Sequence, residues 1–122
     1  MTWLVLAALR TELRPVLRLL HPRPRRVAGR SCHERGPLVF AVGGVGPAAA
    51  GKAASRLADA LKPDVLVSTG FAGAIAPGFE TGDLILGGTP DVPASEEALR
   101  AAREAAPDAR TGSIVAVDRV LR

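Results

Sequence analysis

The sequence predicts an α/β fold in which helices cover both faces of a mostly parallel β-sheet, a three-layer αβα arrangement. Short apolar runs alternate along the chain with segments of helical periodicity, and turns that contain glycine or proline separate them. In such an alternating order the strands pair in parallel, and each helix crosses over the sheet between two strands. No internal repeat or linker-like segment interrupts the pattern, so we interpret residues 1–122 as one domain.

The beginning of the chain predicts a buried strand followed by an amphipathic helix. Residues 3–8 form a continuous apolar run, which is typical of a strand that is buried on both faces. In the next segment, apolar residues recur at the i, i+3, i+4 and i+7 positions of one helical stripe: Leu13, Val16, Leu17 and Leu20. Pro15 is best tolerated in the first turn of this helix. The polar, basic segment 22–36 is assigned to no element.

Further apolar runs predict strands at residues 38–42, 65–69, 83–86 and 112–117. Between these strands we expect an Ala-rich helix at about residues 48–61 and another helix that starts at Ser95 and ends at Pro107. The second helix has a hydroxyl at its expected cap and two acids in its first turn, and both features favour a helix start.

Arginines that precede residue 36 produce the formal net charge of +4. They are Arg10, Arg14, Arg18, Arg23, Arg25, Arg26, Arg30 and Arg35. A nucleic-acid-binding surface is one interpretation of such a cluster. However, the chain has no Tyr, three Phe and one Trp for base stacking, and no binding module is visible. A solvated basic face is therefore favoured, and no nucleic-acid partner is expected.

The cysteine, the histidines and the apolar segments indicate where in the cell we expect the protein. Cys32 is the single cysteine, so an intrachain disulfide is impossible, as suits a reducing cytoplasm. His21 and His33 have no partners at metal-ligand spacing, and we expect them and Cys32 at the surface. The apolar run at residues 3–9 is too short to span a bilayer and lacks the flanks of a signal peptide. We expect a soluble, cytoplasmic protein with no membrane partner.

The glycine-rich segment after the strand at 38–42 fits two nucleotide-binding patterns incompletely. Residues 44–49 fit G-x-G-x-x-A, but Asp64, twenty residues after Gly44, stands at the start of the next strand. A ribose-binding acid belongs near the other end of that strand. Residues 46–52 fit G-x-x-x-x-G-K, but the next residue is Ala53 instead of the Ser or Thr that holds magnesium. A tight strand-to-helix turn is the favoured interpretation.

Two segments at the predicted carboxyl edge of the sheet are candidates for chemistry. Glu12 follows the first strand, where a carboxylate could act as a general base or could simply stabilise the helix start. Residues 70–73 (Gly-Phe-Ala-Gly) follow the strand at 65–69. Their small side chains let the backbone approach a ligand, but an ordinary tight turn explains them equally well.

Several segments, in this order, resemble one family, the 5′-methylthioadenosine/S-adenosylhomocysteine nucleosidases of the nucleoside phosphorylase/nucleosidase superfamily. They are AALRTEL at 7–13, GGVGP at 43–47, KPD at 62–64, STGFAG at 68–73, TGDLI at 81–85 and GSIVAVD at 112–118. The stretch from 62 to 85 is the most specific, because its strand, glycine turn and Gly-Asp-strand recur at the family's spacing. The resemblance covers nearly all of the chain.

The resemblance implies hydrolysis of the N-glycosidic bond of a purine nucleoside, with Glu12 as the residue that activates the attacking water. The other matched positions lie near the ribose and its 5′ substituent, beside the nucleophile and base, or against the purine: Val45 and Gly46, then Phe71, Ala72 and Gly73, then Val120 and Leu121. No metal or organic cofactor is implied, and a homodimer is expected for the full-length form.

The departures from the family's pattern concern the nucleophile and the substrate. Phosphorylases carry an arginine and a serine around the third strand to hold phosphate, whereas Ser68 and Phe71 stand there in this sequence. Without a guanidinium, phosphate loses a charge-assisted bidentate partner, which favours water as the nucleophile. The short stretch between Leu86 and Gly112 is closer to the branches that act on futalosine or adenosyl-hopane.

The family's ribose-binding Met-Glu motif and its purine-protonating Asp have no counterpart in these 122 residues. The chain thus resembles the N-terminal half of a member, and we expect it to be incomplete for catalysis. Two alternatives stay open: a phosphate-dependent nucleoside phosphorylase, and a non-catalytic α/β domain that binds a nucleoside or a partner chain.

Overall fold

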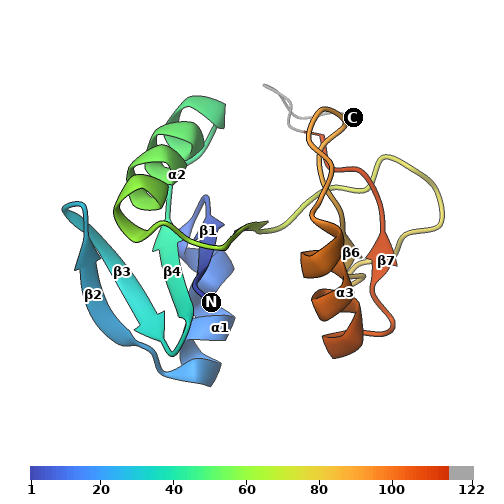
Figure 1. Ribbon diagram of the computed structural model, residues 1–122. Helices are drawn as coiled ribbons and strands as arrows, with labels where there is room; N and C mark the ends of the chain where they lie inside the picture. Colours follow the sequence, from blue (N-terminus) through green and yellow to red (C-terminus); the bar gives the residue numbers. More distant parts are fainter. Residues whose placement is uncertain (116–122) are drawn as a thin grey trace. The chain divides into compact units, whose positions relative to one another are not determined.

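The computed structural model describes residues 1–115, whose elements are grouped in two compact units. Unit 1 is Met1–Ala72, and unit 2 is Gly73–Arg122, of which residues 73–115 are described. Figure 1 labels the elements along the chain. The interpretation of the chain as one domain stays a prediction. None of the helices within residues 1–115 has the length and apolar character needed to cross a membrane.

Unit 1 is built on a five-stranded sheet in the order β2-β3-β4-β1-β5. The strands are β1 (Trp3–Ala7), β2 (Arg23–Val27), β3 (Arg30–Arg35), β4 (Leu38–Val42) and β5 (Val65–Thr69). β1 pairs in parallel with both β4 and β5, which confirms the three strands that the apolar runs predict. β2 pairs antiparallel with β3, and β3 antiparallel with β4. The prediction of a mostly parallel sheet is therefore wrong: the sheet is mixed.

A hairpin in the segment that was assigned to no element causes this difference. Val27 pairs with Arg30 across a two-residue turn, in which Ala28 and Gly29 both have positive φ angles of 49° and 79°. Two residues with positive φ give the tight turn whose twist matches that of two antiparallel strands. Glu34 fastens the open end of the hairpin, because its carboxylate accepts from Arg23 Nε at 2.9 Å and also pairs with Arg25.

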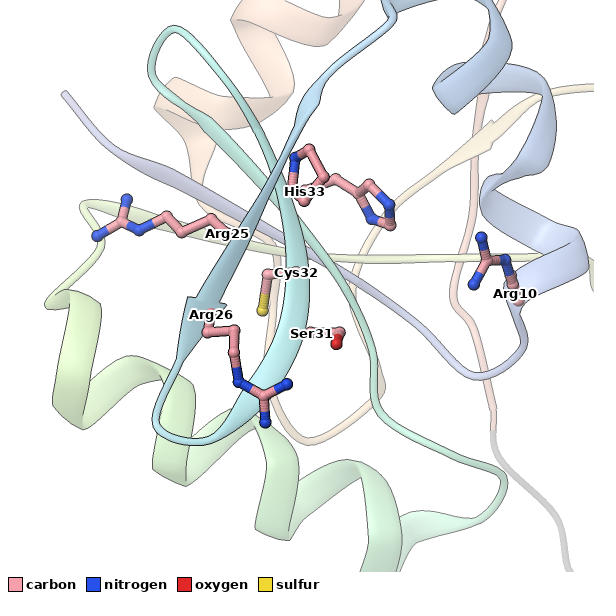
Figure 2. Close-up of a pocket in the computed structure, with 7 residues that line it drawn as sticks. Arg10, Arg25, Arg26, Ser31, Cys32 and His33 are labelled. Carbon is pink, nitrogen blue, oxygen red and sulfur yellow. The ribbon is translucent and has the colours of Figure 1, made fainter.

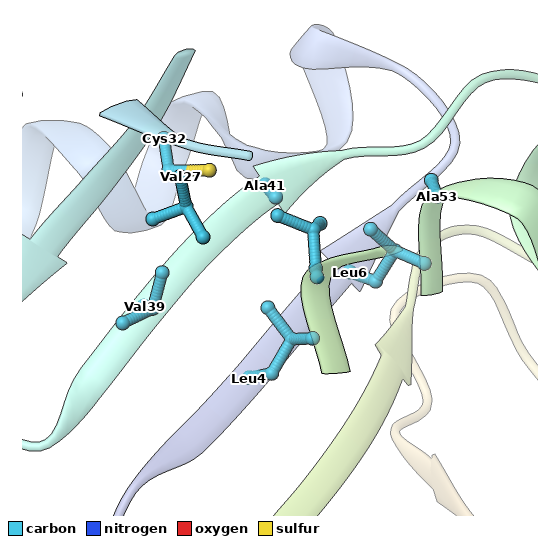
Figure 3. Close-up of a cluster of buried hydrophobic side chains, with 8 residues drawn as sticks. Leu4, Leu6, Val27, Cys32, Val39, Ala41 and Ala53 are labelled. Carbon is cyan, nitrogen blue, oxygen red and sulfur yellow. The ribbon is translucent and has the colours of Figure 1, made fainter. Parts of the chain in front are cut away.

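The two helices of unit 1 cover opposite faces of the sheet. α2 (Pro47–Leu61) packs Ala53 and Leu57 on one face, where they join a core cluster formed by strand residues (Figure 3): Leu4, Leu6, Val27, Cys32, Val39 and Ala41. α1 (Arg10–Leu20) packs Leu13 on the other face, against Ala7 and Phe40. Because side chains alternate along a strand, each of β1 and β4 contributes to both clusters.

Two details of unit 1 differ from the sequence-based expectations. Pro15 is the sixth residue of α1 and lies beyond the first turn, so the helix lacks the N–H that would bond the carbonyl of Thr11. Cys32 is buried in the core instead of exposed at the surface, with a relative exposure of 1%. Desolvation by this burial raises the pKa of the Cys32 thiol above its ordinary value.

Unit 2 contains α3 (Glu96–Ala105) and two short parallel strands, β6 (Ile85–Leu86) and β7 (Arg110–Thr111). The predicted cap of α3 is confirmed, since the Ser95 hydroxyl accepts from the Ala98 N–H at 3.3 Å. The predicted strand at 83–86 is shorter than expected. The prediction of a strand at 112–117 is wrong for residues 112–115, because β7 ends at Thr111. Gly112 N still donates to Leu86 O at 3.0 Å. Residues 116–117 lie outside the described part of the chain.

Candidate functional site

The candidate site lies at the edge of unit 1 where parallel strands end. β1 and β5 run in parallel with Ala7 beside Thr69, so the segments that follow them leave the sheet at the same edge. The first of these segments starts α1 and carries Glu12. The second is the turn that begins with Gly70 and Phe71. Ligands of open α/β sheets bind at this edge, because loops from several strands meet there.

The Glu12 carboxylate joins these two segments through backbone N–H groups. Its Oε1 accepts from Leu9 N at 2.8 Å, at the start of its own helix, and its Oε2 accepts from Phe71 N at 2.9 Å, across the sheet edge. Each carboxylate oxygen has room for a second hydrogen bond, so Glu12 can still accept a proton or bind a water molecule. Glu12 is only partly buried, which leaves it accessible from solvent.

Gly70 is the residue that permits this contact, and the sequence interpretation gave it no individual role. A Cβ atom at position 70 would lie 2.1 Å from Glu12 Oε2, closer than any real side-chain carbon approaches an oxygen. A glycine immediately after a strand, at the same edge as a carboxylate, is the signal in the sequence that could have indicated the contact.

The glycine turn after β4 forms a second part of the same edge. Gly43 N donates to Ala7 O at 2.8 Å, which ties the ends of β4 and β1 together. Gly44 and Gly46 both have a φ of 95°, a conformation that L side chains rarely adopt, and α2 starts directly afterwards at Pro47. This geometry agrees with the tight strand-to-helix turn that the sequence favours.

The dinucleotide-binding alternative is wrong, because Asp64 lies at the opposite edge of the sheet. Its carboxylate accepts from Thr2 N at 2.7 Å, before β1 begins, so it cannot reach a ribose at the carboxyl edge. Lys52 is exposed on α2, as expected for a residue on a solvated helix face.

The structure brings only some of the predicted site residues together. Glu12 contacts the backbone of Phe71, whose side chain is 81% exposed. Val45 and Gly46 lie in the turn after β4 and are exposed. Ala72 is also exposed and ends unit 1, whereas Gly73 begins unit 2 and has open space around its Cα. Val120 and Leu121 lie outside the described residues.

Residues 1–115 offer no cluster of metal ligands. Within residues 1–115, the side chains of His, Cys, Asp and Glu form no group of three or more that could hold a metal ion. His21 is exposed, as expected, and His33 is partly buried on β3. The described chemistry of the edge therefore rests on one carboxylate and on backbone groups.

Comparison with known protein families identifies the superfamily to which the chain is similar. Residues 6–89 match the family model described as the phosphorylase superfamily. The matched span begins inside β1 and extends beyond β6. It includes Glu12, the glycine turn after β4 and the turn at residues 70–73.

Proposed function

The chain belongs to the phosphorylase superfamily, and from that premise we propose that it cleaves the N-glycosidic bond of a purine nucleoside with water as the nucleophile. Superfamily membership itself supports an activity of the nucleoside phosphorylase or nucleosidase type. The choice of a purine nucleoside and of water goes further and rests on the residues at the carboxyl edge of unit 1.

The position of Glu12 is the observation that carries the proposal. Two backbone N–H groups, at 2.8 Å and 2.9 Å, fix both carboxylate oxygens at the edge where the loops after β1 and β5 meet. In the proposed reaction Glu12 accepts a proton from water as the water oxygen bonds to C1′ of the ribose. The bond from C1′ to the purine nitrogen breaks, and its electron pair leaves with the purine. A base held in this way contributes about 10²–10⁴-fold in rate.

The residues around the end of β5 favour water over phosphate. A phosphate nucleophile needs cationic donors, and an arginine binds it best because its guanidinium offers two parallel N–H bonds. From Val65 to Gly73 the chain contains no arginine or lysine, and the resemblance matches Ser68 and Phe71 to the positions of a phosphorylase's anion-binding pair. Water carries no charge and needs only a proton acceptor, which Glu12 supplies.

The test measures free purine released from a panel of purine nucleosides, with and without added phosphate. We expect release without phosphate and a fall of about 10²-fold or more in Glu12→Gln, because the amide keeps the shape but cannot take the proton. Asp59→Asn is the matched control, since it also converts an exposed carboxylate of unit 1 into an amide, on α2 and outside the site. Its turnover should equal that of the unmodified protein.

Two results would overturn the proposal. Strict dependence on phosphate, with ribose 1-phosphate as the product, would show that phosphate is the nucleophile. Equal turnover in Glu12→Gln and the unmodified protein would reduce Glu12 to a structural residue. The protein is assayed in the full form that its gene encodes, because the proposal assigns no residue of these 122 to protonation of the departing purine.

A non-catalytic nucleoside-binding domain is the second candidate function. The observation in its favour is that Glu12 already serves the start of α1, since Oε1 caps the Leu9 N–H. An acid in the first turn of a helix stabilises it without any chemistry. Saturable nucleoside binding with no base release, unchanged in Glu12→Gln, would identify this second function.

A further inference from the structure

A shallow hollow on the hairpin of unit 1, of about 320 Å³, plays no part in the proposed reaction. Five of its lining residues carry strong hydrogen-bond donors: Arg10, Arg25, Arg26, Ser31 and His33. Of these, Arg25 is already paired with Glu34. We call it the basic hollow. Arg10 is the first residue of α1, Arg26 belongs to β2, and Ser31 and His33 belong to β3.

The alternation of side chains along the hairpin explains why these groups share one side. Val27 and Cys32 point into the core cluster under α2, so their neighbours Arg26, Ser31 and His33 point to the opposite face, where α1 lies. Figure 2 shows Ser31 and His33 on the side of Arg10, whereas Arg25 points away from them. The donors therefore come from three elements of the fold toward one surface.

Glu34, the acid of the hairpin, pairs with one lining residue, Arg25, and within residues 1–115 leaves Arg10 and Arg26 without an ion pair. Glu34 accepts from Arg23 Nε at 2.9 Å and also pairs with Arg25, and both arginines lie on the other face of the hairpin. The lining of the basic hollow contains no carboxylate. Among residues 1–115, the ion pairs do not include Arg10 or Arg26.

Two further features raise the positive potential of the hollow. Arg10 stands at the start of α1, where the partial positive charge of the helix dipole adds to that of the guanidinium. Arg26 Nη2 donates to Gly29 O at 2.7 Å, which orients the guanidinium and leaves its other N–H groups available. Several donors around one hollow that has no carboxylate in its lining suit a ligand that supplies several anionic oxygens.

We propose that the basic hollow binds a phosphoryl group, separately from the nucleoside reaction at Glu12. A phosphoryl group offers three oxygens to two guanidinium groups, a hydroxyl and an imidazole, and each bond to a guanidinium is charge-assisted. The ligand is either inorganic phosphate or the phosphate of a small phosphorylated metabolite. In either case, phosphate bound here does not act as the nucleophile.

The test titrates the full chain with inorganic phosphate, adenosine 5′-monophosphate and adenosine, and follows backbone amide shifts by NMR. We expect saturable shifts at Arg26, Ser31 and His33 with one or both phosphate-containing probes, and none there with adenosine. Arg10→Gln and Arg26→Gln should each weaken the binding about tenfold, the effect of losing one charge-assisted hydrogen bond. A response to inorganic phosphate identifies the free ion as a ligand, and a response to the nucleotide alone identifies a phosphorylated metabolite.

Arg56→Gln is the matched control, because Arg56 is exposed on α2, on the opposite face of the sheet. It removes the same charge and should leave the affinity unchanged. Glu12→Gln should also leave the affinity for phosphate unchanged. The result of this titration does not depend on whether the proposed nucleoside reaction at Glu12 is correct. Equal losses in Arg56→Gln and Arg10→Gln, or shifts with no saturation, would overturn the proposal. Should Arg26→Gln fail to fold, Arg10→Gln carries the test alone.

Discussion

The two units of the molecule differ in what holds them together. Unit 1 contains all of the buried hydrophobic side chains that the structure describes, among them Leu4, Leu13 and Leu57. Residues 73–115 of unit 2 contain none, and several of their large apolar side chains are more than 40% exposed: Ile75, Leu84, Val92, Ile114 and Val115. Apolar runs in a sequence thus build a core only where a helix covers each face of the strands.

Backbone and polar contacts supply the order of unit 2 instead. Arg110 is the centre of these contacts, since its Nη1 donates to Gly78 O at 2.5 Å and lies 3.4 Å from Asp83 Oδ2. Its guanidinium carbon also lies 4.2 Å from the centre of the Phe79 ring. Exposed contacts of this kind contribute little individually. The comparison therefore predicts that unit 1 carries most of the stability of the described chain.

Removal of a core side chain should show the largest difference between the units. Leu57→Ala leaves a cavity beneath α2 and should lower the free energy of unfolding by about 2–5 kcal/mol. Leu84→Ala in unit 2 should change it by no more than about 0.5 kcal/mol, because Leu84 is 53% exposed. Urea titrations followed by far-ultraviolet circular dichroism report on both units, and the fluorescence of Trp3, the single tryptophan and part of β1, reports on unit 1. Similar losses in the two variants would refute the comparison.

The sequence predicts the fold of unit 1 well where apolar patterning is strong. β1, β4, β5 and α2 lie where the apolar and Ala-rich runs predict them, because buried strands and helices need such residues. The β2–β3 hairpin gives no such signal, since four of the five residues of β2 are exposed. The pairing of Glu34 with two arginines depends on contacts between strands, which the order of residues alone does not reveal.

The candidate site was predictable in its location and less so in its details. The convergence of Glu12 with residues 70 and 71 follows from two parallel strands that end at one edge. The individual contacts do not follow from it. Phe71 takes part through its backbone N–H, and Gly70 through the absence of a side chain. Both depend on distances below 3 Å, which only a three-dimensional structure supplies.

Two glycines on either side of the boundary between the units provide the second prediction. Gly70→Ala should displace the Glu12 carboxylate, the flexible end of its side chain, and lower the free energy of unfolding by about 0.5–1.5 kcal/mol, because the hydrogen bond from Phe71 N is lost. Gly73→Ala, at the start of unit 2, should cost no more than about 0.5 kcal/mol, since open space surrounds that Cα. Thermal denaturation, with the amide shifts of Leu9 and Phe71 as local probes, measures both. Equal costs would mean that Glu12 is not held as described.

The smallest expected effect is the loss of stability of the β2–β3 hairpin when Glu34 is protonated at acid pH. Hydrogen bonds from Arg23, and then from Arg25, hold the pKa of the Glu34 carboxyl below its ordinary value. A lowered pKa stabilises the fold fully above the unfolded-state pKa of about 4.3, and this contribution is lost as the pH falls through the folded-state pKa. The protection of the β2 and β3 amides against exchange, relative to unstructured amides at the same pH, should therefore fall below about pH 4.

Glu34→Gln provides the control for this acid effect. The variant should exchange faster than the unmodified protein at neutral pH and should respond less to acid, because it has no proton to gain. Exposed amides of unit 2, such as those near Thr89, should show no matching change. If the protection of the hairpin amides in the unmodified protein did not change below about pH 4, the stabilising role given to Glu34 would be contradicted.

The two edges of the sheet in unit 1 are chemically unlike. β2 forms one edge and has a proline and three arginines among its five residues, so it presents like charges and one missing N–H to any strand that approaches. β5 forms the other edge and carries neither charge nor proline. Among the described strands, the sequence of β5 therefore permits the addition of a strand, whereas that of β2 opposes it. We therefore expect self-association through this sheet to join the β5 edges of two copies, because a chain of copies would also need β2 to pair.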